Sequence, residues 1–127
     1  MTTALRLTAD IPAWRPRSKE FGGNARLHRF ARAKLAKVAR NKVGDALMVA
    51  GWPRELPAGR FVLTFRVECA HGVLPDSDNQ VSVLKETRDA VAAWLNTTDA
   101  PTGPLRWRYA YRSGPVDRVV MVLEEIP

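Results

Sequence analysis

The chain has little sulfur chemistry and no long apolar run. Cys69 is its one cysteine, so no disulfide can form within the chain, and nothing points to an oxidising compartment. No apolar stretch approaches the roughly 20 residues that a transmembrane helix needs. The first ten residues lack the charged start and apolar core of a signal peptide. We therefore expect a cytoplasmic protein.

Several binding motifs are also missing. The sequence has no GxxxxGK[ST] and no GxGxxG, so a loop that cradles nucleotide phosphates has no support. Its two histidines, His28 and His71, are not spaced with Cys69 as zinc ligands are. Neither a nucleotide cofactor nor a structural zinc is therefore expected.

Acidic residues are scarce relative to basic ones. The chain has 20 Lys and Arg against 13 Asp and Glu, a formal net charge of +7 and a pI of about 10.3. Ten of the basic residues lie between Trp14 and Lys42, with Glu20 as the one acid among them. This bias favours a polyanionic partner, nucleic acid before an anionic membrane surface. The structural alternative is a protein that is basic without such a partner.

The 127 residues suit one domain, 1–127, with a modest core. Apolar periodicity predicts strands over 5–11 and 61–69 and helices over 24–49 and 81–95. Two further strands, 105–111 and 116–126, are predicted to form a hairpin around Ser113-Gly114-Pro115. The order β-α-β-α-β-β predicts an α/β domain with a small mixed β-sheet and helices packed on it.

The same periodicity predicts which side chains are buried. Alternation along 61–69 separates an apolar face from a polar one. The expected core positions are Phe61, Leu63, Phe65 and Val67 on the strand; Leu27, Phe30, Ala31, Leu35, Val38 and Ala39 on the first helix; and Val81, Leu84, Val91 and Leu95 on the second.

Acidic side chains gather in residues 75–99, PDSDNQVSVLKETRDAVAAWLNTTD. Asp76 and Asp78 are two residues apart, which in an extended segment puts both carboxylates on one face. Asp99 joins them if the turn after the second helix folds back to the helix start. Converging carboxylates that leave coordination positions open are what a divalent metal needs in a phosphodiester-cleaving site. The segment therefore predicts a metal-dependent enzyme that acts on nucleic acid.

Two further residues fit that chemistry. Lys85 is expected about two turns into the helix, where its ammonium can stabilise charge developing on a phosphate. Asn79 is expected to cap the helix or to hold a carboxylate. An ordinary structural interpretation stands beside this one. An Asp-Ser-Asp-Asn turn is a common helix N-cap, and Lys85 with Asp89 is a common exposed ion pair.

Three segments resemble the RusA-type Holliday-junction resolvases, small endonucleases of phages and prophages. They are NARLHRFARAK from Asn24 to Lys34, the acidic segment DSDN with Lys85, Asp89 and Asp99, and VVMVLEEI from Val119 to Ile126. The resemblance implies a RusA-like fold and a homodimer that makes paired, symmetric nicks across a four-way DNA junction. It also implies magnesium as the cofactor, with manganese as the alternative, and the host cytoplasm as the location if a phage encodes the chain.

The resemblance assigns roles to individual residues. Asp76, Asp78 and Asp99 would bind the metal, and Lys85 would be the catalytic lysine. The contacts to DNA phosphates would come from Arg15, Arg17, Lys19, Arg26, His28 and Arg32.

Two departures from the family pattern bear on activity. Lys85 follows Asp78 by seven residues, where the best-known members have four. Asp99 is followed by Ala100, where the family often has a second acid. The second departure favours an alternative, a non-catalytic junction- or duplex-binding protein with the same fold. A third hypothesis is a basic interaction domain of another class, such as a phage assembly factor.

Overall fold

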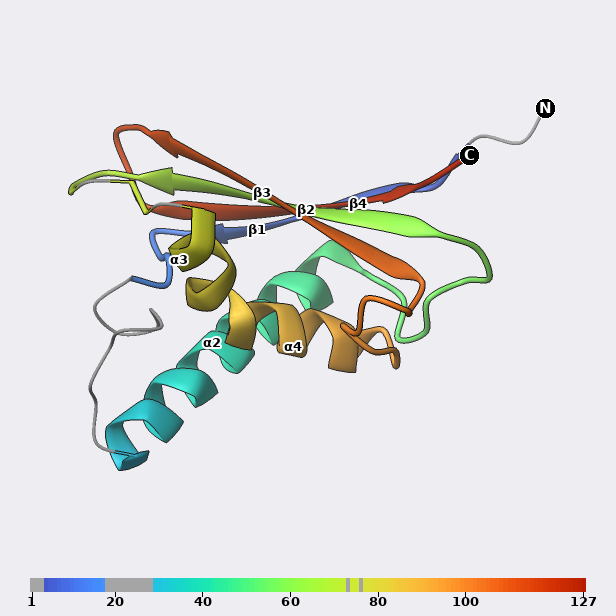
Figure 1. The fold of residues 1–127 in the computed structure, drawn as a ribbon, viewed down its shortest axis with the longest axis horizontal. Coiled ribbons are helices and arrows are strands. Elements are labelled where there is room, and N and C mark those ends of the chain that lie inside the picture. Colours follow the sequence, from blue (N-terminus) through green and yellow to red (C-terminus); the bar gives the residue numbers. More distant parts are fainter. Residues whose placement is uncertain (1–3, 18–28, 73, 76) are drawn as a thin grey trace.

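The computed structural model of the chain describes residues 4–17, 29–72, 74–75 and 77–127, with the side chains of residues 77–79 excepted. The elements follow in the order β1 (Arg6–Pro12), α2 (Arg29–Ala50), β2 (Phe61–Cys69), α3 (Ser77–Val83), α4 (Lys85–Trp94), β3 (Leu105–Ser113) and β4 (Arg118–Glu125). The predicted small mixed sheet with helices packed on it is confirmed (Figure 1). The helix predicted over 81–95 is instead two helices, which part at Leu84.

The strands lie in the order β1-β4-β2-β3. β4 runs antiparallel to both β1 and β2, whereas β2 and β3 are parallel, with Phe61 opposite Leu105 and Cys69 opposite Ser113. The predicted hairpin of the last two strands is therefore wrong, because β2 lies between them. A parallel pair needs a crossover, and α3 and α4 supply it on one side of the sheet.

The connection from β3 to β4 crosses the end of β2 instead of closing a hairpin. The Gly114 N–H donates to the Cys69 carbonyl (3.1 Å), and the Val116 N–H donates to Glu68 Oε2 (3.3 Å). A Cβ at Gly114 would lie 2.4 Å from Glu68 Cδ, so this position needs glycine. Glu68 also binds Arg112 Nη2 at 2.9 Å. The buried Glu68 carboxylate thus fixes the path of the crossing.

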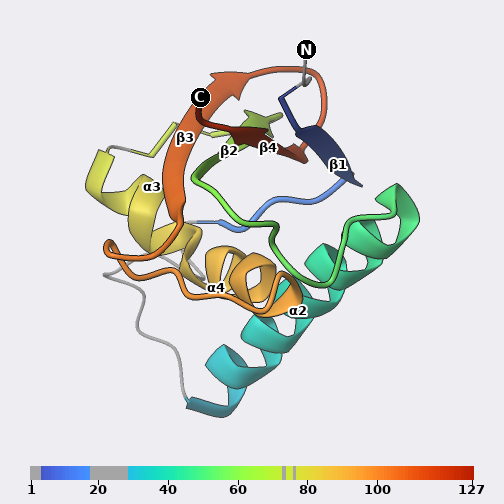
Figure 2. The same ribbon diagram turned by 90° about the vertical axis from the view of Figure 1, so that its right-hand side faces the viewer.

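One face of the sheet carries the hydrophobic core. Phe61, Leu63, Phe65 and Val67 are at most 1% exposed, as their alternation predicted. Helices α2 and α4 cover this face from the same side (Figure 2). The residues that α2 buries are Ala36, Ala39, Val43, Ala46 and Leu47. Burial of this apolar surface, at about 25 cal/mol per Å², is the main favourable term in folding.

The apolar face predicted for the first helix is confirmed at Ala39 but is wrong in the N-terminal half of α2 at Phe30, Ala31 and Val38, and Leu27 lies outside the described residues. Phe30 is 68% exposed and Val38 is 38% exposed. This half of α2 leads away from the sheet, so burial begins only at Ala36 (Figure 1). Val81 is also exposed, because the break at Leu84 separates it from the buried face of α4. Within the described residues, no helix has the length and apolar character that a membrane crossing requires.

Asp117 ties the β3–β4 connection to the segment after β1. Its carboxylate accepts hydrogen bonds from Arg15 Nε (3.0 Å), Arg17 Nη2 (3.0 Å) and the Ala70 N–H (2.9 Å). Burial alone would raise the pKa of Asp117. The Ala70 N–H and the two guanidinium groups outweigh that effect and hold the pKa below its ordinary value of 3.8. The ionised carboxylate is therefore a stabilising element of the fold.

We expect Asp117→Asn to lower the free energy of unfolding by about 1–3 kcal/mol at neutral pH, because the amide cannot replace two charge-assisted bonds. A lowered folded-state pKa means that the stabilisation is complete above pH 3.8 and disappears as pH falls through the folded-state value. Urea unfolding across the acidic range measures this. The exposed Asp45→Asn is the control and should change little. If the difference in free energy of unfolding between wild type and Asp117→Asn stays constant down to strong acid, the lowered pKa of Asp117 is contradicted.

Candidate active site

Lys85, Asp89 and Asp99 meet at the beginning of α4. Lys85 is the first residue of α4, and its Nζ lies 3.5 Å from Asp89 Oδ2. Asp99 lies close enough to the Asp89 carboxyl group to raise its pKa. Lys85 therefore starts a new helix, instead of lying two turns into an old one as the sequence predicted. The expected pair of Lys85 with Asp89 is confirmed.

The turn after α4 brings Asp99 back along the helix. Asn96 adopts a left-handed conformation (φ 53°), which asparagine tolerates better than most residues. The N–H groups of Asn96 and Thr97 cap α4 by donating to the carbonyls of Ala93 (3.2 Å) and Ala92 (2.9 Å). The turn thus places Asp99 beside Arg88 of α4, whereas its predicted return to the helix start, beside Asp76 and Asp78, stays a prediction.

Arg88 fixes the position of Asp99. Its Nε lies 3.6 Å from Asp99 Oδ2, and its side chain is only 13% exposed. Its Nη1 donates to the Val81 carbonyl of α3 (3.0 Å) and to the Tyr109 hydroxyl of β3 (3.0 Å). The guanidinium therefore links both helices of the crossover to β3. Sequence reasoning missed Arg88, because no local pattern distinguishes it from other helix arginines.

The carboxyl pair is electrostatically unusual. Burial raises the pKa of Asp89, the hydrogen bond to Asp99 raises it further, and Lys85 only partly opposes them. A second carboxylate opposes the ionisation of its neighbour, but here each carboxyl group also has a cation beside it: Lys85 lies 3.5 Å from Asp89, and Arg88 lies 3.6 Å from Asp99. Such pairs are typical of functional sites. The sequence analysis named Asp89 as the ion-pair partner of Lys85 and as part of the RusA-like segment, but gave it no role as a metal ligand.

Two of the three predicted metal ligands, Asp76 and Asp78, lie wholly or partly outside the described structure. Asp76 lies outside the described residues, and Asp78 belongs to α3, with no description of its side chain. Because α3 begins at Ser77, spacing along an extended strand does not apply from there on, and Asn79 lies within the helix instead of capping it. In the described part of the chain, no three His, Cys, Asp or Glu side chains form a metal-binding group. The convergence of Asp76, Asp78 and Asp99 stays a prediction.

Two of the predicted DNA contacts lie beside Asp117. Arg15 is mostly buried: its side chain is 10% exposed, and it also donates to the His71 carbonyl (2.9 Å). Arg17 keeps 42% of its side chain exposed. Arg15 is therefore placed to orient the segment, while Arg17 remains accessible to a ligand. The DNA role of both stays a prediction.

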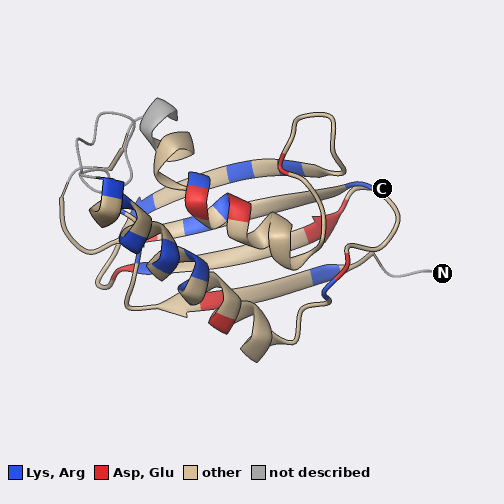
Figure 3. Cartoon of the chain, turned by 90° about the horizontal axis from the view of Figure 1, so that it is seen from below, with Lys and Arg blue, Asp and Glu red and all other residues tan. Residues whose placement is uncertain are grey.

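The other predicted DNA contacts lie in or before α2. Arg32 is exposed on α2, among the Lys and Arg residues that Figure 3 shows along this helix. Lys19, Arg26 and His28 lie outside the described residues. The Lys and Arg residues of α2 thus present their positive charge on the side of the sheet where the helices lie.

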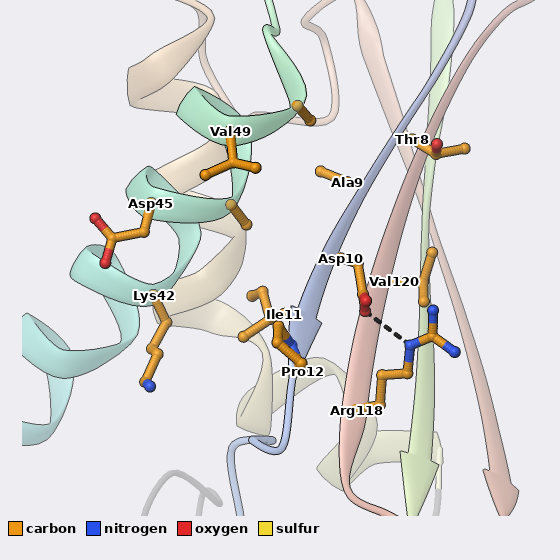
Figure 4. Close-up of a pocket in the computed structure, with 12 residues that line it drawn as sticks. Thr8, Ala9, Asp10, Ile11, Pro12, Lys42, Asp45, Val49, Arg118 and Val120 are labelled. Atoms are coloured by element: carbon orange, nitrogen blue, oxygen red, sulfur yellow. Dashed lines mark hydrogen bonds and ion pairs between the residues drawn. The ribbon is translucent and has the colours of Figure 1, made fainter.

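A groove on the surface lies away from the cluster of Lys85, Asp89 and Asp99. This groove of ≈ 650 Å³ runs between β1 and the C-terminal half of α2 and is lined mainly by small and apolar side chains (Figure 4). Its polar members include Lys42, Asp45 and the ion pair of Asp10 with Arg118 (2.8 Å). Of the described site residues, neither Lys85, Asp89 nor Asp99 lines this groove.

Comparison with known proteins adds no family to this geometry. No protein-family model matches the chain, and no curated protein is significantly similar to it. The resemblance to RusA-type resolvases therefore depends on the motif residues alone.

We expect Asp99→Asn to lower the pKa of Asp89 toward 3.8, because it removes the charge of the neighbouring carboxylate. Burial should keep the value above 3.8. Carbon-detected NMR titration of the aspartate side chains measures it, and Asp45→Asn, remote on α2, should leave it unchanged. If the pKa of Asp89 does not move in Asp99→Asn, the two carboxyl groups do not interact in solution.

Proposed function

We propose that this chain is a magnesium-dependent, structure-selective endonuclease that resolves four-way DNA junctions by paired, symmetric nicks. One observation carries the proposal: Lys85 lies 3.5 Å from Asp89, and Asp99 lies beside the same helix turn, 3.6 Å from Arg88, in a strongly basic protein. Acidic side chains that cluster in a basic protein can bind a metal ion. The basic side chains around them can bind the phosphates of DNA. The homodimer and the paired nicks have support from the resemblance alone.

The residues suit distinct tasks in phosphodiester hydrolysis. A divalent metal, when bound, supplies an activated water and neutralises phosphate charge. Asp89 and Asp99 offer oxygen ligands from α4 and the turn after it, and Asp76 and Asp78 are the predicted additional ligands. The Lys85 ammonium, 64% exposed, is accessible to charge that develops on the leaving oxygen. Arg88 acts only through Asp99, as a positioning residue.

One contact favours the alternative of a non-catalytic junction- or duplex-binding protein. The Arg88 guanidinium already lies 3.6 Å from Asp99, where it competes with a metal for the same carboxylate. Ala100 supplies no second acid to replace it. In this alternative, the protein binds DNA through its basic surface but does not cleave it.

The deciding experiment incubates the protein with a labelled four-way junction or a matched linear duplex, with magnesium or with EDTA. We expect paired nicks on the junction only, and only with magnesium. Asp78→Asn should abolish cleavage while keeping or tightening junction binding, because loss of a carboxylate lowers repulsion of phosphate. Asp45→Asn should cleave like the wild type. Tight junction binding by the wild type without any nick would support the non-catalytic alternative, and an active Asp78→Asn would exclude Asp78 as a ligand.

The positioning role of Arg88 has its own test. We expect Arg88→Gln to slow junction cleavage about 10- to 100-fold, as loss of an outer-shell partner does. Junction affinity in EDTA should change less than about twofold, because Arg88 is largely buried and contacts no phosphate. Restored cleavage at raised magnesium distinguishes weakened metal binding from damage to the fold. If Arg88→Gln loses thermal stability together with cleavage, and raised magnesium does not restore cleavage, the role of Arg88 is purely structural.

A further inference from the structure

The sheet has one covered face and one bare face. All the described helices lie on the core side (Figures 1 and 2). The strand registers place every second residue of each strand on the opposite side. These bare-face residues are Arg6, Thr8, Asp10 and Pro12; Arg118, Val120, Val122 and Glu124; Val62, Thr64, Arg66 and Glu68; and Arg106, Arg108, Ala110 and Arg112.

The bare face is strongly cationic, and all its bases are arginines. It holds six arginines against three acidic residues. Three of the arginines are paired: Arg6 with Glu124 (3.7 Å), Arg112 with Glu68 (2.9 Å) and Arg118 with Asp10 (2.8 Å). The other three, Arg66, Arg106 and Arg108, are exposed and have no carboxylate partner among the described residues.

The three unpaired arginines are neighbours. Arg106 and Arg108 are two residues apart on the edge strand β3, a separation of roughly 6.6 Å. Arg66 lies on the adjacent strand, opposite Ala110. Because Ala110 is short, a hollow of ≈ 440 Å³ opens here, lined in part by Arg66, Arg112 and Arg118. The guanidinium groups thus form a band over β2 and β3 with a recess in it.

We propose that this bare face binds the phosphodiester backbone of a duplex arm, in addition to the arm held on the helix-bearing side. The guanidinium fork matches phosphate oxygens, and a net positive surface attracts a polyanion. A second copy of the chain fits less well. Val122 is 1% exposed and Val62 and Val120 are half-buried, so the face has little accessible apolar surface for a stable protein interface.

The two sides of the sheet cannot touch the same stretch of duplex. A linear duplex therefore occupies one side at a time, whereas a branched DNA offers separate arms to both. This extension rests on the proposed function for the helix-bearing side. It gives a physical origin for structure selectivity, since binding of two linked arms raises affinity through effective concentration.

The test counts short duplexes bound to each protomer in EDTA at low salt, by native mass spectrometry. We expect two for the wild type and one for R66Q/R106Q/R108Q. Junction affinity in EDTA should fall at least about tenfold in the triple variant, while affinity for the linear duplex changes little. The slope of log affinity against log salt should become shallower by about 0.9 for each phosphate that the variant no longer neutralises.

A matched pair of single substitutions controls for net charge. Arg108→Gln and Arg54→Gln each remove one positive charge, but Arg54 stacks on Trp94 of α4 (3.9 Å), away from the bare face. We expect only Arg108→Gln to weaken junction binding. Arg106 also donates to the Gly103 carbonyl (2.8 Å), so R66Q/R108Q repeats the test with that bond intact.

Three results would overturn the proposal. One is a triple variant that still binds two duplexes and the junction as the wild type does. Another is equal loss of affinity in Arg54→Gln and Arg108→Gln. The third is a change of protomer number in sedimentation of the triple variant together with one duplex per wild-type protomer, which would make the face an interface between copies.

Failure of the bare-face proposal is separable from failure of the proposed function. If the wild type cleaves junctions with magnesium and the triple variant binds as the wild type does, only the bare-face proposal fails. If the wild type never cleaves but the triple variant binds one duplex fewer, the bare face binds DNA and the endonuclease assignment fails.

Discussion

The parallel pairing of β2 with β3 is the constraint on which the rest of the structure depends. Parallel neighbours oblige the chain to return to the starting edge of the sheet, and residues 70–104 make that return. A crossover must pack on one face, so α3 and α4 lie on the core side together with α2. The candidate site is built within this return: Lys85 begins α4, and the turn after α4 carries Asp99 back to Asp89.

The same constraint leaves one face of the sheet bare, and the sheet has two edge strands, β1 and β3, that need protection. At β1, the Trp52 indole N–H donates to the Thr8 carbonyl (3.0 Å), and Pro12 has no N–H to offer another strand. At β3, the opposite edge, three of the four bare-face side chains are the exposed arginines Arg106, Arg108 and Arg112. Charged side chains along an edge discourage pairing with another chain. The arginines thus have a structural use besides the ligand role proposed for them.

The sequence predicted elements better than contacts between elements. The strand over 61–69 was placed at its bounds, because period-2 alternation is a local property of a half-buried strand. The hairpin of β3 and β4 was wrong because it depended on a non-local choice: β2 inserts between them, and the crossing depends on the buried Glu68, which the alternation put on the solvent side. Phe30 and Val38 were misplaced for a similar reason. Their spacing is helical, but spacing does not show where the covering layer ends.

At the candidate site, the sequence identified the residue types but not the described residues that Asp99 would contact. Asp89 and Arg88 become partners of Asp99 only through the turn at Asn96 and the position of β3. Other carboxylates of the described chain, such as Asp10 and Asp117, form their ion pairs with arginine and have no acidic partner. Asp89 has Asp99 beside it as well as Lys85, and the pKa of Asp89 is raised although Lys85 is adjacent. A chain with a net charge of +7 has enough Lys and Arg side chains to pair with both Asp89 and Asp99. The position of Asp99 beside Asp89, together with the raised pKa of Asp89, distinguishes this cluster from an ordinary surface ion pair.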